Sequence, residues 1–158
     1  MSEQRPFQRT IYSRTVTINA PRQWVWDILL DLPQYSAWNP FTYRVDSSLQ
    51  IGAPVDLYVR FARRGEVVQK EQVRIVQQPE RLAWGMKLGA EFLLCAQRDQ
   101  VLVALDDKRC TYQTWDAFSG LLTPLVLGLF GADIESGFNA AADALKQRAE
   151  TLWQQHSG

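Results

Sequence analysis

The residues best suited to chemistry lie between positions 109 and 119, where polar and apolar side chains alternate. Tyr112, Thr114, Asp116 and Phe118 are two residues apart, so a β-strand would place all four on one face. Burial could raise the pKa of the Asp116 carboxyl until it acts as an acid or base, with Tyr112 or Thr114 as a hydrogen-bond partner. Asp116 is therefore the candidate catalytic residue, and this face is the candidate binding surface.

Arg14 is the cation that the sequence places nearest to this face. It lies on a second predicted strand, in register with the apolar Val16 and Ile18. Arg14 could stabilise an enolate, but a cation beside Asp116 would lower the pKa of that carboxyl and weaken it as a base. The two side chains could equally form a buried ion pair that only fixes the register of the strands.

Apolar side chains complete the predicted pocket. Trp84 and Met86 alternate on one predicted strand, while Leu125, Leu129 and Phe138 lie on the apolar side of the predicted final helix. A mostly apolar surface with a few polar groups is typical of a small-molecule site, although Trp84 and Phe138 could also simply fill the core. The full set of predicted ligand-binding residues is Arg14, Trp84, Met86, Tyr112, Thr114, Asp116, Phe118, Leu125, Leu129 and Phe138.

The sequence offers few other groups for catalysis. The only histidine, His156, lies in a polar tail, so no Ser-His-Asp, Cys-His or metal-ligand set stands out. Cys95 and Cys110 lack the C-x-x-C spacing of metal and redox sites, and we expect them to be buried thiols. We therefore expect neither a metal nor a cofactor.

Composition and charge narrow the class of protein. A chain of 158 residues with 46% hydrophobic residues fits one folded domain, and 17 Lys and Arg balance 17 Asp and Glu, which argues against nucleic acid as a partner. Residues 1–10 lack the apolar core of a secretory signal, and the most apolar stretch, 121–132, falls short of the roughly 20 residues that span a bilayer. We expect a cytoplasmic protein without a membrane span.

The elements that must position these residues form a single α+β domain at 10–154, between an N-terminal polar tail (1–9) and a C-terminal tail (155–158). Residues 10–19 predict a strand, and two short helices follow it at 21–32 and 34–38. Alternation then predicts six strands, at 41–46, 55–63, 66–78, 81–88, 96–105 and 109–119. We expect a curved antiparallel sheet of six or seven strands wrapped around a long C-terminal helix at 121–154.

Four motifs in this order resemble those of the SRPBCC superfamily, the START-like helix-grip fold, and within it the polyketide cyclase/dehydrase group. They are A-P-R-Q-W-V-W-D at 20–27, W-N-P-F at 38–41, R-L-A-W at 81–84 and F-S-G-L-L-T-P-L at 118–125. The resemblance covers about residues 10–150. It implies a cavity between the sheet and the last helix that encloses an apolar ligand.

The chain departs from this group at two places. Relatives often carry Gly-Glu-His where residues 96–99 read Ala-Gln-Arg-Asp, and they tend to carry His and Glu where this chain has Thr114 and Asp116. Both histidines are lost and the acid survives as Asp116, so a mechanism that depends on a histidine is unexpected here.

Three functions follow from this interpretation, because a fold alone does not decide function. The first is binding or transport of a hydrophobic small molecule, such as a lipid or a polyketide. The alternative is a polyketide cyclase/dehydrase-type enzyme with Asp116 as acid or base, and a protein-interaction module is a further alternative. We expect a binding protein rather than an enzyme, and a homodimer if Leu93, Leu94 and the apolar stretch 121–130 are exposed.

Overall fold

A computed structural model describes residues 5–158, so residues 1–4 of the predicted N-terminal tail lie outside the described part of the chain. Two short strands, β1 (Arg9–Tyr12) and β2 (Val16–Ile18), precede helix α1 (Arg22–Leu30) and the 3-10 helix η1 (Leu32–Ala37). Six longer elements of sheet follow: β3 (Thr42–Asp46), β4 (Pro54–Phe61), β5 (Gly65–Gln77), β6 (Arg81–Leu88), β7 (Leu94–Asp106) and β8 (Arg109–Ser119). Helix α2 (Thr123–Ser157) ends the chain, which confirms the predicted α+β class.

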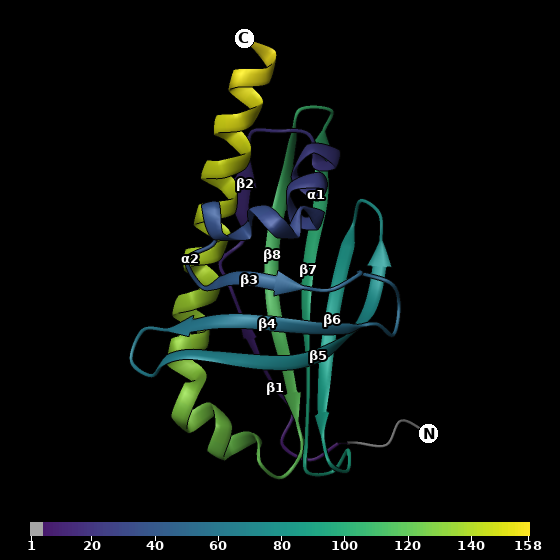
Figure 1. The fold of residues 1–158 in the computed structure, drawn as a ribbon, viewed down its shortest axis with the longest axis vertical. Coiled ribbons are helices and arrows are strands. Elements are labelled where there is room, and N and C mark those ends of the chain that lie inside the picture. Colours follow the sequence, from purple (N-terminus) through teal and green to yellow (C-terminus); the bar gives the residue numbers. More distant parts are fainter. Residues whose placement is uncertain (1–4) are drawn as a thin grey trace.

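The described strands form one antiparallel sheet in the order β1-β8-β7-β6-β5-β4-β3, with β2 also paired to β8. Figure 1 shows that β3, β4 and β5 run across the direction of β6, β7 and β8, while α2 runs along the sheet. A sheet bent this strongly has a concave face, and α2 covers it. This is the predicted helix-grip arrangement.

The predicted strand at 10–19 is wrong at its centre, because β1 and β2 are separate strands. Ser13 lies between them: its backbone N–H donates to the Thr114 carbonyl at 2.8 Å, and its Oγ accepts the Thr114 N–H at 3.0 Å. The hydroxyl therefore replaces a ladder hydrogen bond, and the chain bends at residues 13–15 before pairing with β8 again.

The helices after β2 close one end of the sheet, and the W-N-P-F segment connects them to β3. Asn39 Oδ1 accepts the backbone N–H groups of Phe41 and Thr42 at 3.0 and 2.9 Å. This turn is buried, so both donors would otherwise have no partner. It directs the Phe41 ring and the Thr42 hydroxyl toward the space beneath the sheet.

Helix α2 buries a stripe that differs in phase from the predicted one. Ile134, Phe138 and Leu145 are buried, but Leu125 is 60% exposed and Leu129 is 44% exposed. Steps of four residues back from Phe138 pass through Ile134, Phe130 and Val126, so these side chains face the sheet and the predicted Leu125 and Leu129 turn outward.

Gly137 allows α2 to approach β3 closely. A Cβ atom at this position would lie 2.2 Å from the Phe41 ring, so no larger residue fits without a shift. The Phe41 ring also packs edge-on against Phe61 and Phe138, with centroids 5.6 and 5.8 Å away. These contacts bring the helix close to the sheet at one end.

The sheet opens between β5 and β6. Pairing of these strands covers only Gln72–Gln77 of β5 against Arg81–Gly85 of β6, so residues 65–71 of β5 pair with β4 alone. The far ends of the two strands diverge, and the space between them and the first turns of α2 leads into the interior.

Candidate functional site

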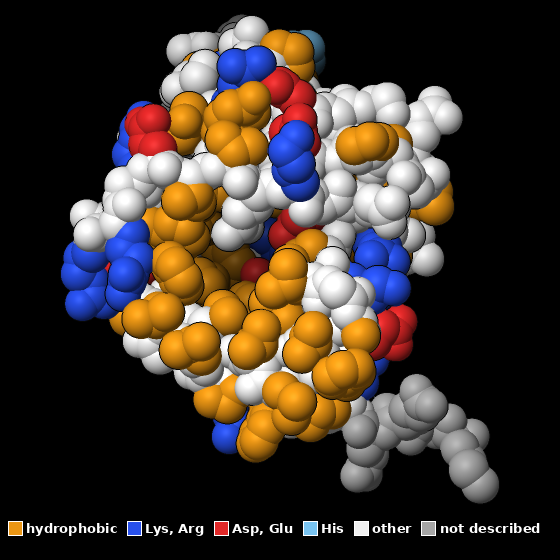
Figure 2. Space-filling model, turned by 60° about the horizontal axis from the view of Figure 1, so that its bottom comes forward, with side chains coloured by type: hydrophobic (Ala, Val, Ile, Leu, Met, Phe, Trp, Pro, Cys, Tyr) orange, Lys and Arg blue, Asp and Glu red, His pale blue; other side chains and the backbone are white. Residues whose placement is uncertain are grey.

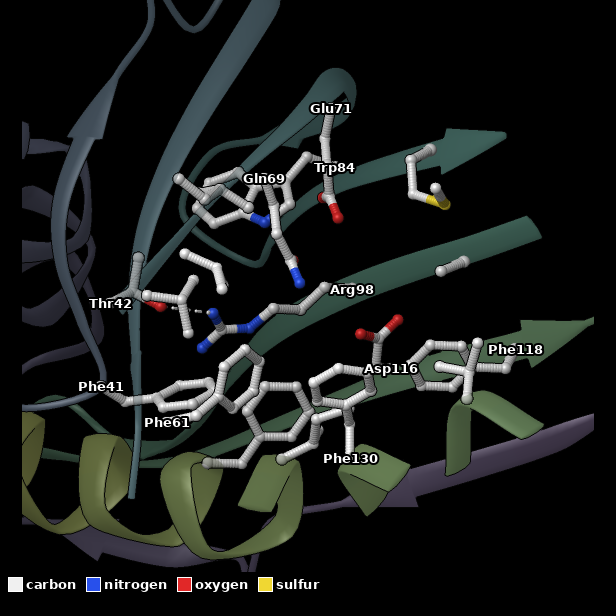
Figure 3. A pocket seen from close by; sticks show the side chains of 18 of the residues that line it. Phe41, Thr42, Phe61, Gln69, Glu71, Trp84, Arg98, Asp116, Phe118 and Phe130 are labelled. Atoms are coloured by element: carbon white, nitrogen blue, oxygen red, sulfur yellow. Dashed lines mark hydrogen bonds between the residues drawn. The ribbon is translucent and has the colours of Figure 1, made fainter. Parts of the chain in front are cut away.

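A cavity of about 310 Å³ lies between the concave face of the sheet and α2 (Figure 3). Its walls are mainly apolar and come from β3 to β8 and from α2. The apolar side chains are Phe41, Leu57, Val59, Phe61, Val67, Trp84, Met86, Leu94, Ala96, Phe118, Val126, Phe130, Ile134 and Phe138. Such a cavity suits the hydrophobic body of a small molecule.

Arg98 of β7 is the central polar side chain of the cavity. It is 6% exposed, its Nε donates to Thr114 Oγ1 at 3.2 Å, and its Nη1 donates to Thr42 Oγ1 at 3.2 Å. The guanidinium also lies 4.6 Å from the centre of the Phe138 ring. Within residues 5–158 it has no carboxylate partner at ion-pair distance, so its charge is neutralised only in part.

Two carboxyl groups share the cavity with Arg98. Asp116 of β8 and Glu71 of β5 each have one buried oxygen without a hydrogen-bond partner among the described residues. Figure 3 shows both carboxyl groups pointing toward the space around the Arg98 side chain. The polar side of the cavity therefore combines the Arg98 guanidinium with two acids that it does not contact directly.

The acids are weak because they are buried. Burial raises the pKa of Asp116 to about 7, against the opposing effect of Arg98, and Asp99 raises it a little further. Burial also raises the pKa of Glu71 to about 8, with a smaller contribution from the charge of Asp116, while Arg98 and Arg74 lower it. Near neutral pH, Glu71 is mostly protonated and Asp116 is divided between its two forms.

Two neutral groups extend the polar side. Trp84 Nε1 is buried and has no acceptor within the described chain. The Gln69 amide points toward Arg98 in Figure 3. Together with the guanidinium N–H groups, these side chains offer several donors to an oxygen atom in the cavity.

Five of the ten predicted site residues line the cavity: Trp84, Met86, Asp116, Phe118 and Phe138. They come from β6, β8 and α2, where alternation or helical spacing gave the correct face.

Three of the other predicted residues lie elsewhere, two because of the phase of α2 and one because of its position along β8. Leu125 and Leu129 are on the outer side of α2. Tyr112 is buried beyond the cavity, where its hydroxyl donates to Gln100 Oε1 at 2.8 Å.

Thr114 supports Arg98 instead of lining the cavity. Its Oγ1 accepts from Arg98 and donates to the Asp99 carbonyl at 2.7 Å.

The predicted role of Arg14 is wrong. Arg14 is exposed in the bend between β1 and β2, and its Nη2 pairs with Asp143 Oδ2 on α2 at 2.8 Å. It therefore does not pair with Asp116, and Arg98 supplies the cation in its place. The spacing of two residues places Ala96, Arg98, Gln100 and Leu102 on one face of the predicted strand at 96–105. All four are buried in the structure, so this face was the sequence signal for Arg98.

The fold and this cavity define a START-like helix-grip protein. Residues 9–150 match the family described as "Polyketide cyclase / dehydrase and lipid transport", and the chain belongs to that family. No match to a curated protein is found. No helix in residues 5–158 is long and apolar enough to cross a membrane.

Solved structures share the fold at low sequence identity. The Zhui aromatase/cyclase from Streptomyces sp. R1128 superposes with a TM-score of 0.72 at 20% identity, over 90% of this chain and 94% of that one. A START superfamily protein from Mycobacterium smegmatis gives 0.66 at 20% identity, over 90% and 98%. Norcoclaurine synthase from Thalictrum flavum gives 0.68 at 14% identity, over 99% and 100%. At these identities the likeness concerns the fold alone.

Proposed function

We propose that this protein binds a small hydrophobic molecule that carries one oxygen-rich polar group, with that group at Arg98 and the apolar body along α2. The observation that supports this most strongly is the buried guanidinium, which has no carboxylate partner among residues 5–158. A buried cation is costly unless an opposite charge or several acceptors surround it. A carboxylate, an enolate or a carbonyl of the ligand would supply those acceptors.

The two acids favour the same kind of ligand. Because the pKa of Glu71 is about 8, its carboxyl is mostly neutral at pH 7 and can donate a hydrogen bond to a ligand oxygen. Asp116, with a pKa of about 7, can take up a proton when an anion arrives. An anionic group would therefore meet a cation and neutral donors, not two negative charges.

The apolar wall favours a ligand with rings or a bent chain. Phe41, Phe61, Phe130 and Phe138 present ring edges and faces to the same space, with Phe61 and Phe130 centroids 5.4 Å apart. Burial of apolar ligand surface against them stabilises the complex by about 25 cal/mol per Å². Lipids with an acidic head and aromatic polyketides both fit this description.

The test compares acids with their esters. Binding of decanoic acid and 2-naphthoic acid, each beside its methyl ester, is measured by calorimetry for the wild type, Arg98→Met and the exposed control Arg14→Met. A charge-assisted hydrogen bond contributes about 1.5–3 kcal/mol, so we expect the wild type to prefer the acids about 10- to 100-fold. Arg98→Met should lose the preference and Arg14→Met should keep it. Equal binding of acid and ester by the wild type would contradict the proposal.

A second candidate is a cyclase/dehydrase-type reaction, favoured by the two acids with pKa values of about 7 and 8. Ionised Asp116 could remove a proton beside a ketone, Arg98 could stabilise the enolate, and protonated Glu71 could protonate the product oxygen. Asp116→Asn should then abolish cyclisation of a poly-β-ketone while the substrate still binds. Unchanged turnover would remove Asp116 from the mechanism.

A further inference from the structure

The first turns of α2 and the two residues before it are almost entirely apolar. The sequence from 121 to 130, L-L-T-P-L-V-L-G-L-F, contains no charged residue. Val126 and Phe130 line the cavity, whereas Leu121, Leu125 and Leu129 are 52%, 60% and 44% exposed. Leu125 and Leu129 are four residues apart on α2 and share one outward face, and Leu121 lies in the turn just before the helix. Water solvates that face poorly, so it calls for a partner.

The loop before β7 continues this surface. Leu121 N–H donates to the Phe92 carbonyl at 2.8 Å, which holds the loop against the start of α2. Phe92 is 57% exposed and Leu88, at the end of β6, is 51% exposed. We call Leu88, Phe92, Leu121, Leu125 and Leu129 the apolar rim. Figure 2 shows apolar side chains gathered around a hollow on this side of the molecule.

The apolar rim lies beside the mouth of the ligand cavity. Val126 and Phe130 connect its helical part to the cavity wall, and residues 67–71 of β5, which do not pair with β6, form the opposite side of the mouth. A partner seated on the rim therefore also faces the cavity. A second copy of the chain would seal the mouth, whereas a lipid surface would allow a hydrophobic ligand to pass without crossing water.

Charge around the rim is positive. Arg64 donates to the Leu129 carbonyl at 3.1 Å and its guanidinium stacks on the Phe130 ring at 4.9 Å. Lys70 lines the cavity and Lys87 precedes Leu88. These three cations have no ion-pair partner within the described chain. Of the acids nearby, Asp133 pairs with Arg63 and Glu91 with Arg5, and Glu71 at the mouth is mostly protonated at pH 7. Two copies facing each other here would bring like charges together.

We propose that the apolar rim docks on the surface of an anionic lipid bilayer, with the cavity mouth toward the membrane. The leucines and Phe92 enter the boundary between head groups and acyl chains, and Arg64, Lys70 and Lys87 lie near the lipid phosphates. The contact is peripheral, because only side chains of the rim enter the lipid. The inference concerns the surface and does not depend on which molecule fills the cavity.

Vesicle flotation without added ligand tests this docking. We expect the wild type to bind phosphatidylcholine vesicles that contain phosphatidylglycerol, to bind pure phosphatidylcholine weakly, and to lose affinity in high salt. Leu125→Ser with Leu129→Ser should weaken binding at least about tenfold, because two apolar contacts with the acyl region are lost. Arg64→Glu should weaken it at least about fivefold, since a cation near an anionic surface contributes about that factor.

The matched control is Val103→Ser with Leu105→Ser on β7. These side chains are 52% and 51% exposed but lie near the β7–β8 turn, away from the rim, so vesicle binding should not change. Thermal melts check that each variant folds, and Arg64→Glu keeps the proposal testable if the leucine variant does not. Arg98→Met should still bind vesicles, which separates this proposal from the proposed ligand site.

Three results would overturn the docking surface. The first is a wild type that does not float with anionic vesicles. The second is a β7 control variant that loses as much binding as the rim variant. The third is a stable dimer, measured by light scattering, that Leu125→Ser with Leu129→Ser dissociates. The rim would then be an interface between two copies of this chain.

Discussion

Glu71→Gln should stabilise the protein at neutral pH, because the native state holds a carboxyl that the unfolded chain would ionise. The pKa of Glu71 is raised by burial from its ordinary value of 4.5 to about 8. Between these two values the native state binds more protons than the unfolded state, so the free energy of unfolding falls as the pH rises. Glutamine keeps the shape and needs no proton.

The size of the effect follows from the two pKa values. In the unfolded chain the carboxyl is ionised at pH 7, which lies about 2.5 units above its pKa. Holding it protonated in the native state therefore lowers the free energy of unfolding by about 3 kcal/mol, at 1.36 kcal/mol per unit. Because the Glu71 side chain is partly exposed at the mouth, we expect a gain of about 2–3 kcal/mol. The gain should vanish near pH 4, where the carboxyl is protonated in both states.

Urea unfolding at pH 4, 7 and 8.5 measures this dependence. The control is Glu66→Gln on the same strand, since Glu66 is exposed and pairs with Arg60 at 3.0 Å. We expect the control to change the free energy of unfolding by less than about 1 kcal/mol at every pH. A Glu71→Gln variant no more stable than the wild type at pH 7, or a gain independent of pH, would refute the assignment of a buried neutral acid.

Two further substitutions test the contacts that shape the cavity. Gly137→Ala should destabilise the protein by about 1–3 kcal/mol, because its Cβ would lie 2.2 Å from the Phe41 ring. Gly128→Ala, with no atom within 4 Å, should stabilise the helix by up to about 1 kcal/mol. Thermal melts that rank the two variants the other way would contradict the close approach of α2 and β3. Asn39→Ala removes the acceptor of the Phe41 and Thr42 N–H groups and should cost about 2 kcal/mol or more in urea unfolding, and a neutral result would mean that water satisfies this turn.

Much of the fold follows from local patterns in the sequence. The bounds of β6 and β8 agree with the predicted strands at 81–88 and 109–119, because alternation and flanking turns mark both ends. The break at Ser13 could not be predicted in this way, since it depends on hydrogen bonds to Thr114, 101 residues further along the chain. The predicted stripe of α2 was wrong at Leu125 and Leu129, because steps of four residues back from the buried Phe138 do not reach them.

The site was harder to predict than the fold. Trp84 and Asp116 follow from alternation on regular strands, and both line the cavity. Glu71 lies on a strand with charges on both faces, so alternation alone does not show which charged side chain is buried. Its burial arises only because β5 leaves β6 at residue 72 and turns its free half over the cavity. Such a long-range change of course has no local signal in the sequence.

A crystal structure of the protein with a bound carboxylic acid such as 2-naphthoic acid would show whether Arg98 holds the polar group of the ligand. We expect electron density for the acid between α2 and the sheet, with a carboxylate oxygen about 3 Å from an Arg98 guanidinium nitrogen and the rings against Phe130 and Phe138. An acid bound with its carboxylate at the mouth and its rings against Arg98, or bound outside the cavity, would contradict it.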